Sequence, residues 1–129
     1  MIMKIDAIVR EEKFEEIYHY GHPLTEDVKN ALMEIEVNGL TVSQVMGCGL
    51  QRGYKEIVRG MEVEPQMQPK VKFEIVVSSE EWAEKTIEAI KKAAYTGEFG
   101  DGKIFSYPVA SATKIRTGET GYDAVQCQE

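Results

Sequence analysis

The clearest structural signal in the sequence is KVKFEIVV, residues 70–77. Its apolar side chains fall at alternate positions, Val71, Phe73, Ile75 and Val77, and Lys72 and Glu74 lie between them. Alternation with a period of two is typical of a strand that has one buried face and one exposed face. We therefore expect a strand here, with one face packed against other elements.

The sequence after this strand predicts a helix and another strand. Ser78 with Glu81 matches a capping box, and the helix should run to about Tyr95, with Gly97 at its C′ position. Its inner stripe has helical spacing: Ala83, Ile87, Ile90 and Ala94, with Trp82 beside it. KIFSYPVA, residues 103–110, reads as a strand in which Pro108 indicates a free edge or a bend. TKIRT, residues 113–117, is a candidate fifth strand, and the acidic tail at about 118–129 is expected to be mobile.

The sequence before residue 70 predicts a strand, a helix and a second strand. MKIDAIV, residues 3–9, should place Ile5, Ala7 and Val9 on one face. TEDVKNALMEIEV follows with Thr25 as a plausible N-cap and Asn38-Gly39 as its end. The buried stripe of this helix is Val28, Leu32 and Ile35. LTVSQVMG, residues 40–47, is the second strand.

Residues 47–69 form a long stretch without a packed pattern. They hold four glycines, two prolines and charges of both signs, with no sustained apolar period. A loop of this length in a small domain is usually functional or disordered, and the strong patterns close to both of its ends favour a working loop. The resulting order is strand, helix, strand, long loop, strand, helix, strand. This is the α+β ferredoxin-like βαββαβ pattern, a four-stranded sheet with two helices on one face.

Composition limits the function classes. A length of 129 residues fits one domain, and no run approaches the roughly 20 apolar residues that span a membrane. The N-terminal apolar run is too short for a secretory signal, so a cytoplasmic protein without membrane insertion is expected. Cys48 and Cys127 form no disulfide framework. A net charge of −7 argues against nucleic-acid binding but allows one small anionic ligand.

The segment TGEFGDGKIF, residues 96–105, permits two interpretations. Gly97 can end a helix and Asp101-Gly102 can turn the chain into a strand, or the glycines can open the backbone around a phosphate. A Walker A loop has its glycines before a helix, whereas these precede a strand. The residues alone leave both interpretations open.

Four blocks in this order resemble the PII nitrogen-regulatory signalling proteins. They are GCGLQRG at the loop entry, PKVK at its exit, TGEFGDGKIF, and KIRTGE. The resemblance covers nearly the whole chain apart from an insertion at about 11–23. It implies a non-enzymatic homotrimer that binds ATP or ADP between subunits. With Mg-ATP bound, such proteins also bind 2-oxoglutarate at the base of the long loop, the T-loop, here about 48–69.

The resemblance also implies site residues and partners. The nucleotide site would comprise Thr41, Gly47, Gly49, Glu74, Val76, Gly100, Asp101, Gly102, Lys103, Lys114 and Arg116. The 2-oxoglutarate site would comprise Gln51, Arg52, Gly53, Lys70 and Phe99, with Gln51 also contributing an oxygen ligand to Mg²⁺. Candidate targets in the family are an ammonium transporter, glutamine synthetase or nitrogenase.

The chain departs from the family pattern at several positions. Leu50 stands where an arginine is common, Cys48 replaces an aromatic residue, and Lys114 keeps a charge but loses the planar fork of an arginine. At the loop tip Val63 stands where many members carry a tyrosine that is modified with a nucleotidyl group. Because Val63 has no hydroxyl, our hypothesis is that the protein signals by ligand occupancy alone, which mass spectrometry of the loop would refute by finding an adduct.

Other interpretations remain open. His19 and His22 form an H-x-x-H in the insertion, but no clear third ligand completes a metal site, and a surface excursion is the preferred interpretation. The fold also hosts enzymes, although we find no nucleophile–base pair, so enzymatic activity would be at most a weak ATPase. A PII-like relative with a different small-molecule effector is the other alternative.

Overall fold

The computed structural model describes residues 1–11, 27–37, 39–48, 57–58, 61–62 and 67–125. Its main elements are β1 (Met3–Arg10), α2 (Asp27–Glu34), β2 (Leu40–Gly47), β5 (Gln68–Val77), α3 (Glu80–Ala94) and β6 (Gly102–Pro108). Three short elements accompany them: β3 (Ile57–Val58), β4 (Met61–Glu62) and α4 (Tyr122–Val125). The expected position of Thr25 and the insertion at about 11–23 lie almost entirely outside the described residues.

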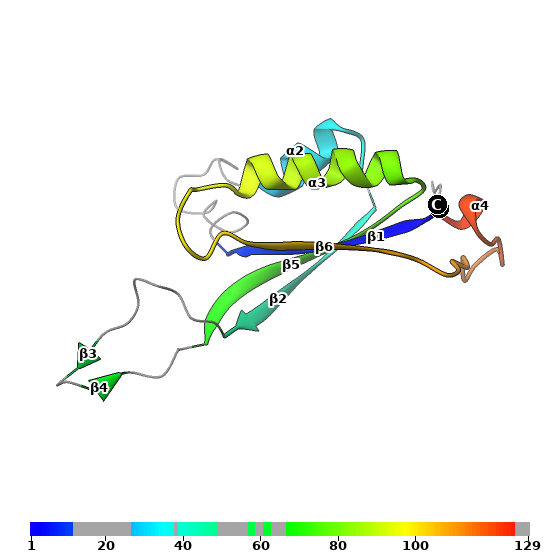
Figure 1. The fold of residues 1–129 in the computed structure, drawn as a ribbon. Coiled ribbons are helices and arrows are strands. Elements are labelled where there is room, and N and C mark those ends of the chain that lie inside the picture. The colour runs from blue at the N-terminus through cyan, green and yellow to red at the C-terminus, as the bar shows by residue number, and fades with distance from the viewer. Residues whose placement is uncertain (12–26, 38, 49–56, 59–60, 63–66, 126–129) are drawn as a thin grey trace, which may run out of the picture.

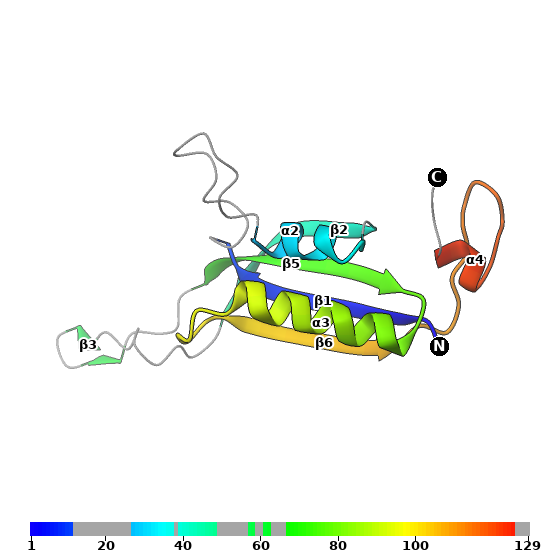
Figure 2. The same ribbon diagram turned by 90° about the horizontal axis from the view of Figure 1, so that it is seen from above.

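The four long strands form one sheet in the order β2-β5-β1-β6. Every neighbouring pair is antiparallel, and β1 lies between β5 and β6. Figures 1 and 2 show α2 and α3 side by side over the same face of this sheet. This arrangement confirms the predicted α+β ferredoxin-like fold.

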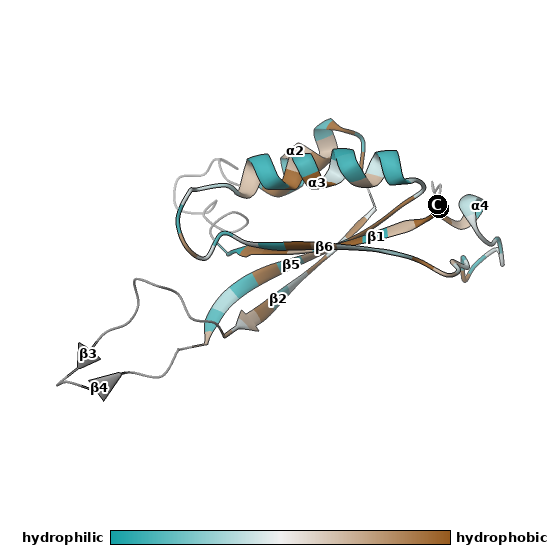
Figure 3. Ribbon diagram, viewed as in Figure 1, coloured by the Kyte–Doolittle hydropathy of each residue, from teal (hydrophilic) through white to brown (hydrophobic). Residues whose placement is uncertain are grey.

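The core lies between that sheet face and the two helices. The alternating positions predicted from the sequence are buried there: Ile5, Ala7 and Val9 of β1, and Val71, Phe73, Ile75 and Val77 of β5. Figure 3 shows hydrophilic residues on the side of α3 that faces away from the sheet. Since fully burying one side chain such as Phe73 contributes roughly 1.5–3 kcal/mol, this alternation is enough to set which face of each strand points inward.

Helix α2 ends earlier than the sequence predicted. Val28 and Leu32 are buried as expected and Ile35 packs at the edge of the core, but the helix ends at Glu34 rather than at Asn38-Gly39. The N–H of Glu36 donates to Met33 O and that of Val37 to Leu32 O, with Glu36 at φ +65°. This is a Schellman motif, and burial of Val37 against the core stabilises it although the C′ residue is not a glycine.

Helix α3 ends close to Tyr95 as predicted, but both of its predicted capping residues differ. Its N-cap is Ser79, whose hydroxyl accepts from Trp82 N at 3.2 Å, so the predicted cap at Ser78 was wrong by one residue. The C-cap is Tyr95, which places Gly97 one residue beyond C′. The inner stripe is confirmed for Ala83, Ile90 and Ala94, with Ile87 partly buried. Thr86 joins the stripe because its hydroxyl donates to Trp82 O at 2.7 Å, which satisfies it inside the core.

The long loop and the tail contain more structure than the sequence predicted. Strands β3 and β4 pair with each other inside the 47–69 stretch, and β5 begins two residues before the predicted strand. The expected fifth strand at 113–117 is wrong, because only Thr113 forms an isolated bridge, to Thr120. The tail holds the short helix α4. Strand β6 ends at Pro108 and is an edge strand, as that proline indicated.

Gly102 is required by the way β6 meets β1. Its φ is +105°, and it pairs with Val9. A Cβ at this position would lie 1.8 Å from the carbonyl oxygen of Ile8. The fold therefore demands a glycine here whether or not the backbone also contacts a ligand.

We predict that Gly102→Ala lowers the free energy of unfolding by about 2–4 kcal/mol, through the clash with Ile8 O and the positive φ. The matched control is Gly118→Ala, where φ is +74° and nothing lies within 4 Å of the added Cβ, so only a backbone cost of about 1 kcal/mol is expected. Chemical denaturation at fixed protein concentration measures both. Equal losses in the two variants would contradict the proposed close approach.

Candidate functional site

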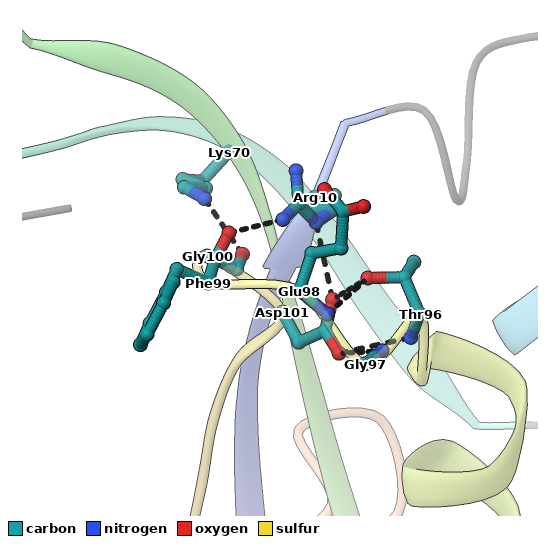
Figure 4. Close-up of polar contacts among 8 residues, drawn as sticks. All are labelled: Arg10, Lys70, Thr96, Gly97, Glu98, Phe99, Gly100 and Asp101. Atoms are coloured by element: carbon teal, nitrogen blue, oxygen red, sulfur yellow. Dashed lines mark hydrogen bonds and ion pairs between the residues drawn. The ribbon is translucent and has the colours of Figure 1, made fainter. Parts of the chain in front are cut away.

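The turn between α3 and β6 is built around the carboxylate of Asp101. Oxygen Oδ2 accepts from the backbone N–H of Thr96 at 2.9 Å and of Gly97 at 3.0 Å. Oxygen Oδ1 accepts from the Thr96 hydroxyl and from Arg10 Nε, the latter at 3.1 Å. Figure 4 shows these contacts converging on one side chain. Asp101 thus stabilises the turn through Thr96 and Gly97 and connects the turn to the end of β1 through Arg10.

These contacts determine the charge state of Asp101. Partial burial would raise the pKa of its carboxyl, but the hydrogen bonds from Thr96, Gly97 and Arg10 outweigh this and lower the pKa from 3.8 to about 2. The carboxylate therefore stays ionised at every physiological pH. Its role within the protomer is to organise the turn, and a direct contact with a nucleotide stays a prediction.

Two cationic side chains donate hydrogen bonds to consecutive backbone carbonyl groups of the same turn. Arg10 Nη2 donates to Phe99 O, and Lys70 Nζ donates to Gly100 O at 2.9 Å. Arg10 and Lys70 are directly opposite each other in the β1–β5 ladder. Like charges in such a pair repel, so the two carbonyls and Asp101 supply the negative potential that keeps both cations in place.

Lys70 also lies at the point where the T-loop leaves the sheet. Gly47 is the last residue of β2 and pairs with Gln68, the first of β5. A Cβ on Gly47 would lie 3.1 Å from Cγ of Lys70, so the glycine leaves room for the lysine side chain. The structure therefore brings together Gly47, Lys70, Phe99 and Gly100, which are four residues of the predicted sites. Phe99 as a whole residue is 67% exposed, and its ring points away from Asp101 (Figure 4).

Several predicted nucleotide residues lie on the sheet face that the helices leave uncovered. Thr41 is opposite Glu74, and Lys103 is opposite Ile8. Glu74 accepts from Lys4 Nζ at 3.0 Å and lies 3.7 Å from Lys72 Nζ. The hydrogen bond to Glu74 is the main reason that the pKa of Lys4 is raised. Val76 is exposed on the same face, beyond Glu74.

Lys114 and Arg116 lie in a turn at the other end of β6. The turn is closed by Lys114 N donating to Glu119 O at 2.8 Å and by Gly118 N donating to Lys114 O at 2.9 Å. Figure 1 shows this segment at the opposite end of the sheet from the 96–101 turn. Seven residues of β6 separate the two, on the order of 20 Å at about 3.3 Å per residue. Within one protomer, Arg116 and the Gly100–Lys103 backbone are not brought together.

Other predicted residues lie outside the described part of the chain. These are Gly49, Leu50, Gln51, Arg52, Gly53, Val63, His19 and His22, so the proposed Mg²⁺ ligand and the H-x-x-H pair stay predictions. Among the described residues, no three His, Cys, Asp or Glu side chains gather closely enough to hold a metal ion. In that same part of the chain, no helix is long and apolar enough to cross a membrane.

Comparison with known sequences identifies the family. A model of the family "Nitrogen regulatory protein P-II" matches residues 21–119. The chain is 48% identical over 122 residues to nitrogen regulatory protein P-II 1 of Methanothermobacter thermautotrophicus, covering 95% of this chain and 96% of that protein. It is 45% identical to the P-II protein of Rhizobium meliloti, with 95% and 98% covered. The chain belongs to the P-II family.

Solved P-II structures share the whole fold. The B. subtilis GlnK structure is similar with a TM-score of 0.72 and 36% identity, covering 95% of this chain and 97% of that one. Arabidopsis thaliana PII bound to citrate has a TM-score of 0.70 at 36% identity, with 95% and 91% covered. A B. subtilis GlnK–ATP complex has a TM-score of 0.71 at 34% identity, with 95% and 96% covered.

Sequence reasoning did not single out Arg10, although it belongs to the same cluster as the predicted P-II site residues. Arg10 is the last residue of β1, and its importance depends on the register that places it opposite Lys70. The sequence offered no sufficient signal, because an antiparallel pairing of the two strands does not by itself fix the register that places Arg10 opposite Lys70.

We predict that Asp101 contributes stability that is constant at neutral pH and is lost in acid. Because its folded pKa is depressed, the contribution is complete above 3.8 and disappears as the pH falls toward about 2. Asp101→Asn should therefore lower the free energy of unfolding by about 1–2 kcal/mol at pH 7, and the difference from the parent should shrink below pH ~4.

Chemical denaturation of both proteins between pH 2.5 and 7, at one protein concentration, measures this difference. Asp123→Asn, which changes an exposed carboxylate in α4, is the control, and it should stay within about 0.5 kcal/mol of the parent throughout. A pH-independent gap for Asp101→Asn would show that the ionised carboxylate is not the source of the effect.

Proposed function

We propose that this P-II protein is a non-enzymatic homotrimeric sensor. It binds ATP or ADP between protomers and, with Mg-ATP bound, 2-oxoglutarate at the base of the T-loop. Occupancy of these sites then changes its affinity for target proteins. The family match supports the regulatory role, and the related GlnK–ATP complex supports a nucleotide ligand.

The observation that carries the proposal is the separation of the predicted phosphate-binding residues along β6. The Gly100–Lys103 backbone lies at one end and Arg116 at the other, farther apart than one nucleotide phosphate chain can span. A site that uses both needs Arg116 from a neighbouring protomer. Closed cyclic symmetry supplies three such sites in a trimer.

The uncovered sheet face supports the same assembly. It is opposite the helices, and its β6 residues Phe105 and Tyr107 are 51% and 39% exposed. Exposed aromatic side chains beside ion pairs such as Lys4–Glu74 are typical of surfaces that are buried on association. A second protomer on this face would cover the aromatic rings and complete the nucleotide site.

The effector site is proposed at Lys70 and Arg10. Their two cations occupy adjacent positions beside the T-loop base, and their combined positive charge would attract a carboxylate. Gln51 would supply a carbonyl oxygen to Mg²⁺, which prefers oxygen ligands. The related plant PII bound to citrate supports a carboxylate ligand and keeps an effector other than 2-oxoglutarate as the second candidate.

Signalling follows from differential binding. A ligand shifts the T-loop only if it binds one loop state better than the other, and the effector cluster lies where the loop joins β2 and β5. We propose a cytoplasmic protein whose targets are of the kind that the family regulates: an ammonium transporter, glutamine synthetase or nitrogenase. Val63 at the loop tip leaves ligand occupancy as the proposed signal.

We predict that defects on the two sides of the nucleotide site complement each other. Lys103→Gln and Arg116→Gln should each weaken ADP binding at least tenfold, since each removes a charge-assisted contact. When the two variants are co-expressed with different tags and mixed trimers are purified, one of the three sites in each trimer should regain both residues and bind with parental affinity.

Calorimetry on the mixed trimers measures the restored fraction. Lys91→Gln, which changes an exposed cation on α3 that lies 3.5 Å from Glu88, is the control and should leave ADP affinity unchanged. Absence of any restored sites, or a monomeric parent protein, would overturn the shared-site proposal.

We also predict that Lys70→Gln abolishes effector binding but leaves ADP binding within about threefold, because Arg10 still holds the same turn through Asp101 and the Phe99 carbonyl. Titration of 2-oxoglutarate and of citrate into Mg-ATP-loaded protein distinguishes the two candidate effectors. Lys91→Gln, which removes an exposed cation on α3, is the control and should bind as the parent does. Unchanged effector binding in Lys70→Gln would exclude this site.

A further inference from the structure

Two peptide planes at the Phe99–Asp101 turn are held by cations. Arg10 donates to the carbonyl of Phe99 and Lys70 donates to the carbonyl of Gly100. A trans peptide is planar, so its carbonyl and its N–H point in opposite directions. No cis peptide is present among the described residues. The N–H groups of Gly100 and Asp101 are therefore directed away from the two cations.

Arg10 holds this turn at a second point. Its Nε donates to Asp101 Oδ1 at 3.1 Å, while the other oxygen of Asp101 accepts from the N–H groups of Thr96 and Gly97. One guanidinium thus connects the end of β1 to both sides of the turn (Figure 4). An ammonium is a single compact donor group and cannot reproduce this two-armed geometry.

We propose that Arg10 is a positioning residue for nucleotide binding: through Asp101 and the Phe99 carbonyl, it orients the Gly100 and Asp101 N–H groups toward a phosphate. This inference rests on the proposed nucleotide site and assigns to that site a residue that does not itself touch the phosphate. Gly100 has a φ of +99°, a backbone conformation that favours glycine.

The register explains why the arrangement is specific to this end of the sheet. Arg10 is opposite Lys70, so both cations reach the same turn from adjacent strands. Arg10 is 20% exposed and Asp101 24% exposed, so their ion pair is partly shielded from water. A shielded, two-armed contact fixes a backbone better than an exposed pair between long flexible side chains.

The test uses ADP without any effector, which separates positioning from a contact between Arg10 and an effector carboxylate. Arg10→Gln should weaken ADP binding about tenfold, the cost of losing one well-oriented hydrogen bond to a charged group. Arg10→Lys keeps the charge but only one arm, and it should fall between the parent and Arg10→Gln. Lys91→Gln is the control for loss of a surface cation.

A double-mutant cycle tests the route. If Arg10 acts mainly through Asp101, Asp101→Asn should weaken ADP binding to a similar degree. The double variant should then bind ADP about as weakly as whichever single variant has the lower affinity. Fully additive losses would show that the two residues act independently and would overturn this route. ADP affinity equal to the parent in Arg10→Gln would overturn the positioning role itself.

A ligand-free readout separates this inference from the proposed function. In NMR spectra of the unliganded protein, Arg10→Gln should shift the amide resonances of Gly100 and Asp101 and leave those of the α3 core, such as Ile90, unchanged. If the parent protein fails to bind ADP, the proposed function fails. If the parent binds ADP but the Gly100 and Asp101 amides of Arg10→Gln remain unshifted, the positioning inference fails. General unfolding of the variant would appear as shifts throughout α3.

Discussion

The central position of β1 is the constraint on which the rest of the structure depends. Its two antiparallel ladders place Arg10 opposite Lys70 on one side and Val9 opposite Gly102 on the other. The second pairing brings the β6 backbone so close to Ile8 O that only glycine fits. Both ladders finish at the same end of the sheet, where β1 reaches Arg10. The turn before β6 and the base of the T-loop therefore lie close together.

This arrangement brings the charges of Arg10, Lys70 and Asp101 together at one end of the sheet. Two cations on adjacent strands repel each other. Two carbonyl oxygens and one ionised carboxylate of the turn accept hydrogen bonds from them and offset this repulsion. Asp101 is held ionised by its hydrogen bonds, so the turn retains this compensation over the physiological pH range. The result is a turn held by several hydrogen bonds beside the segment that the proposed function requires to move, so a ligand at the turn would lie next to that segment.

Periodicity predicted the fold well and element boundaries less well. The alternating residues of 70–77 and the stripe containing Val28 and Leu32 are buried as expected, because burial energy follows side-chain spacing directly. Helix ends were missed because they depend on tertiary packing. Val37 entering the core ends α2 before the glycine, and of the two adjacent serines at the start of α3 it is Ser79, rather than Ser78, that accepts from Trp82 N.

The sequence by itself determined the order of the main elements, the inward faces of the strands at 3–9 and 70–77, and the family, since these follow from side-chain spacing and from short ordered motifs. Only the tertiary structure decided that Arg10 joins Lys70 at the 96–101 turn and that Arg116 lies at the other end of β6. Contacts between distant segments depend on strand register and on the length of the intervening strand. Neither of these can be deduced from a short segment of sequence alone.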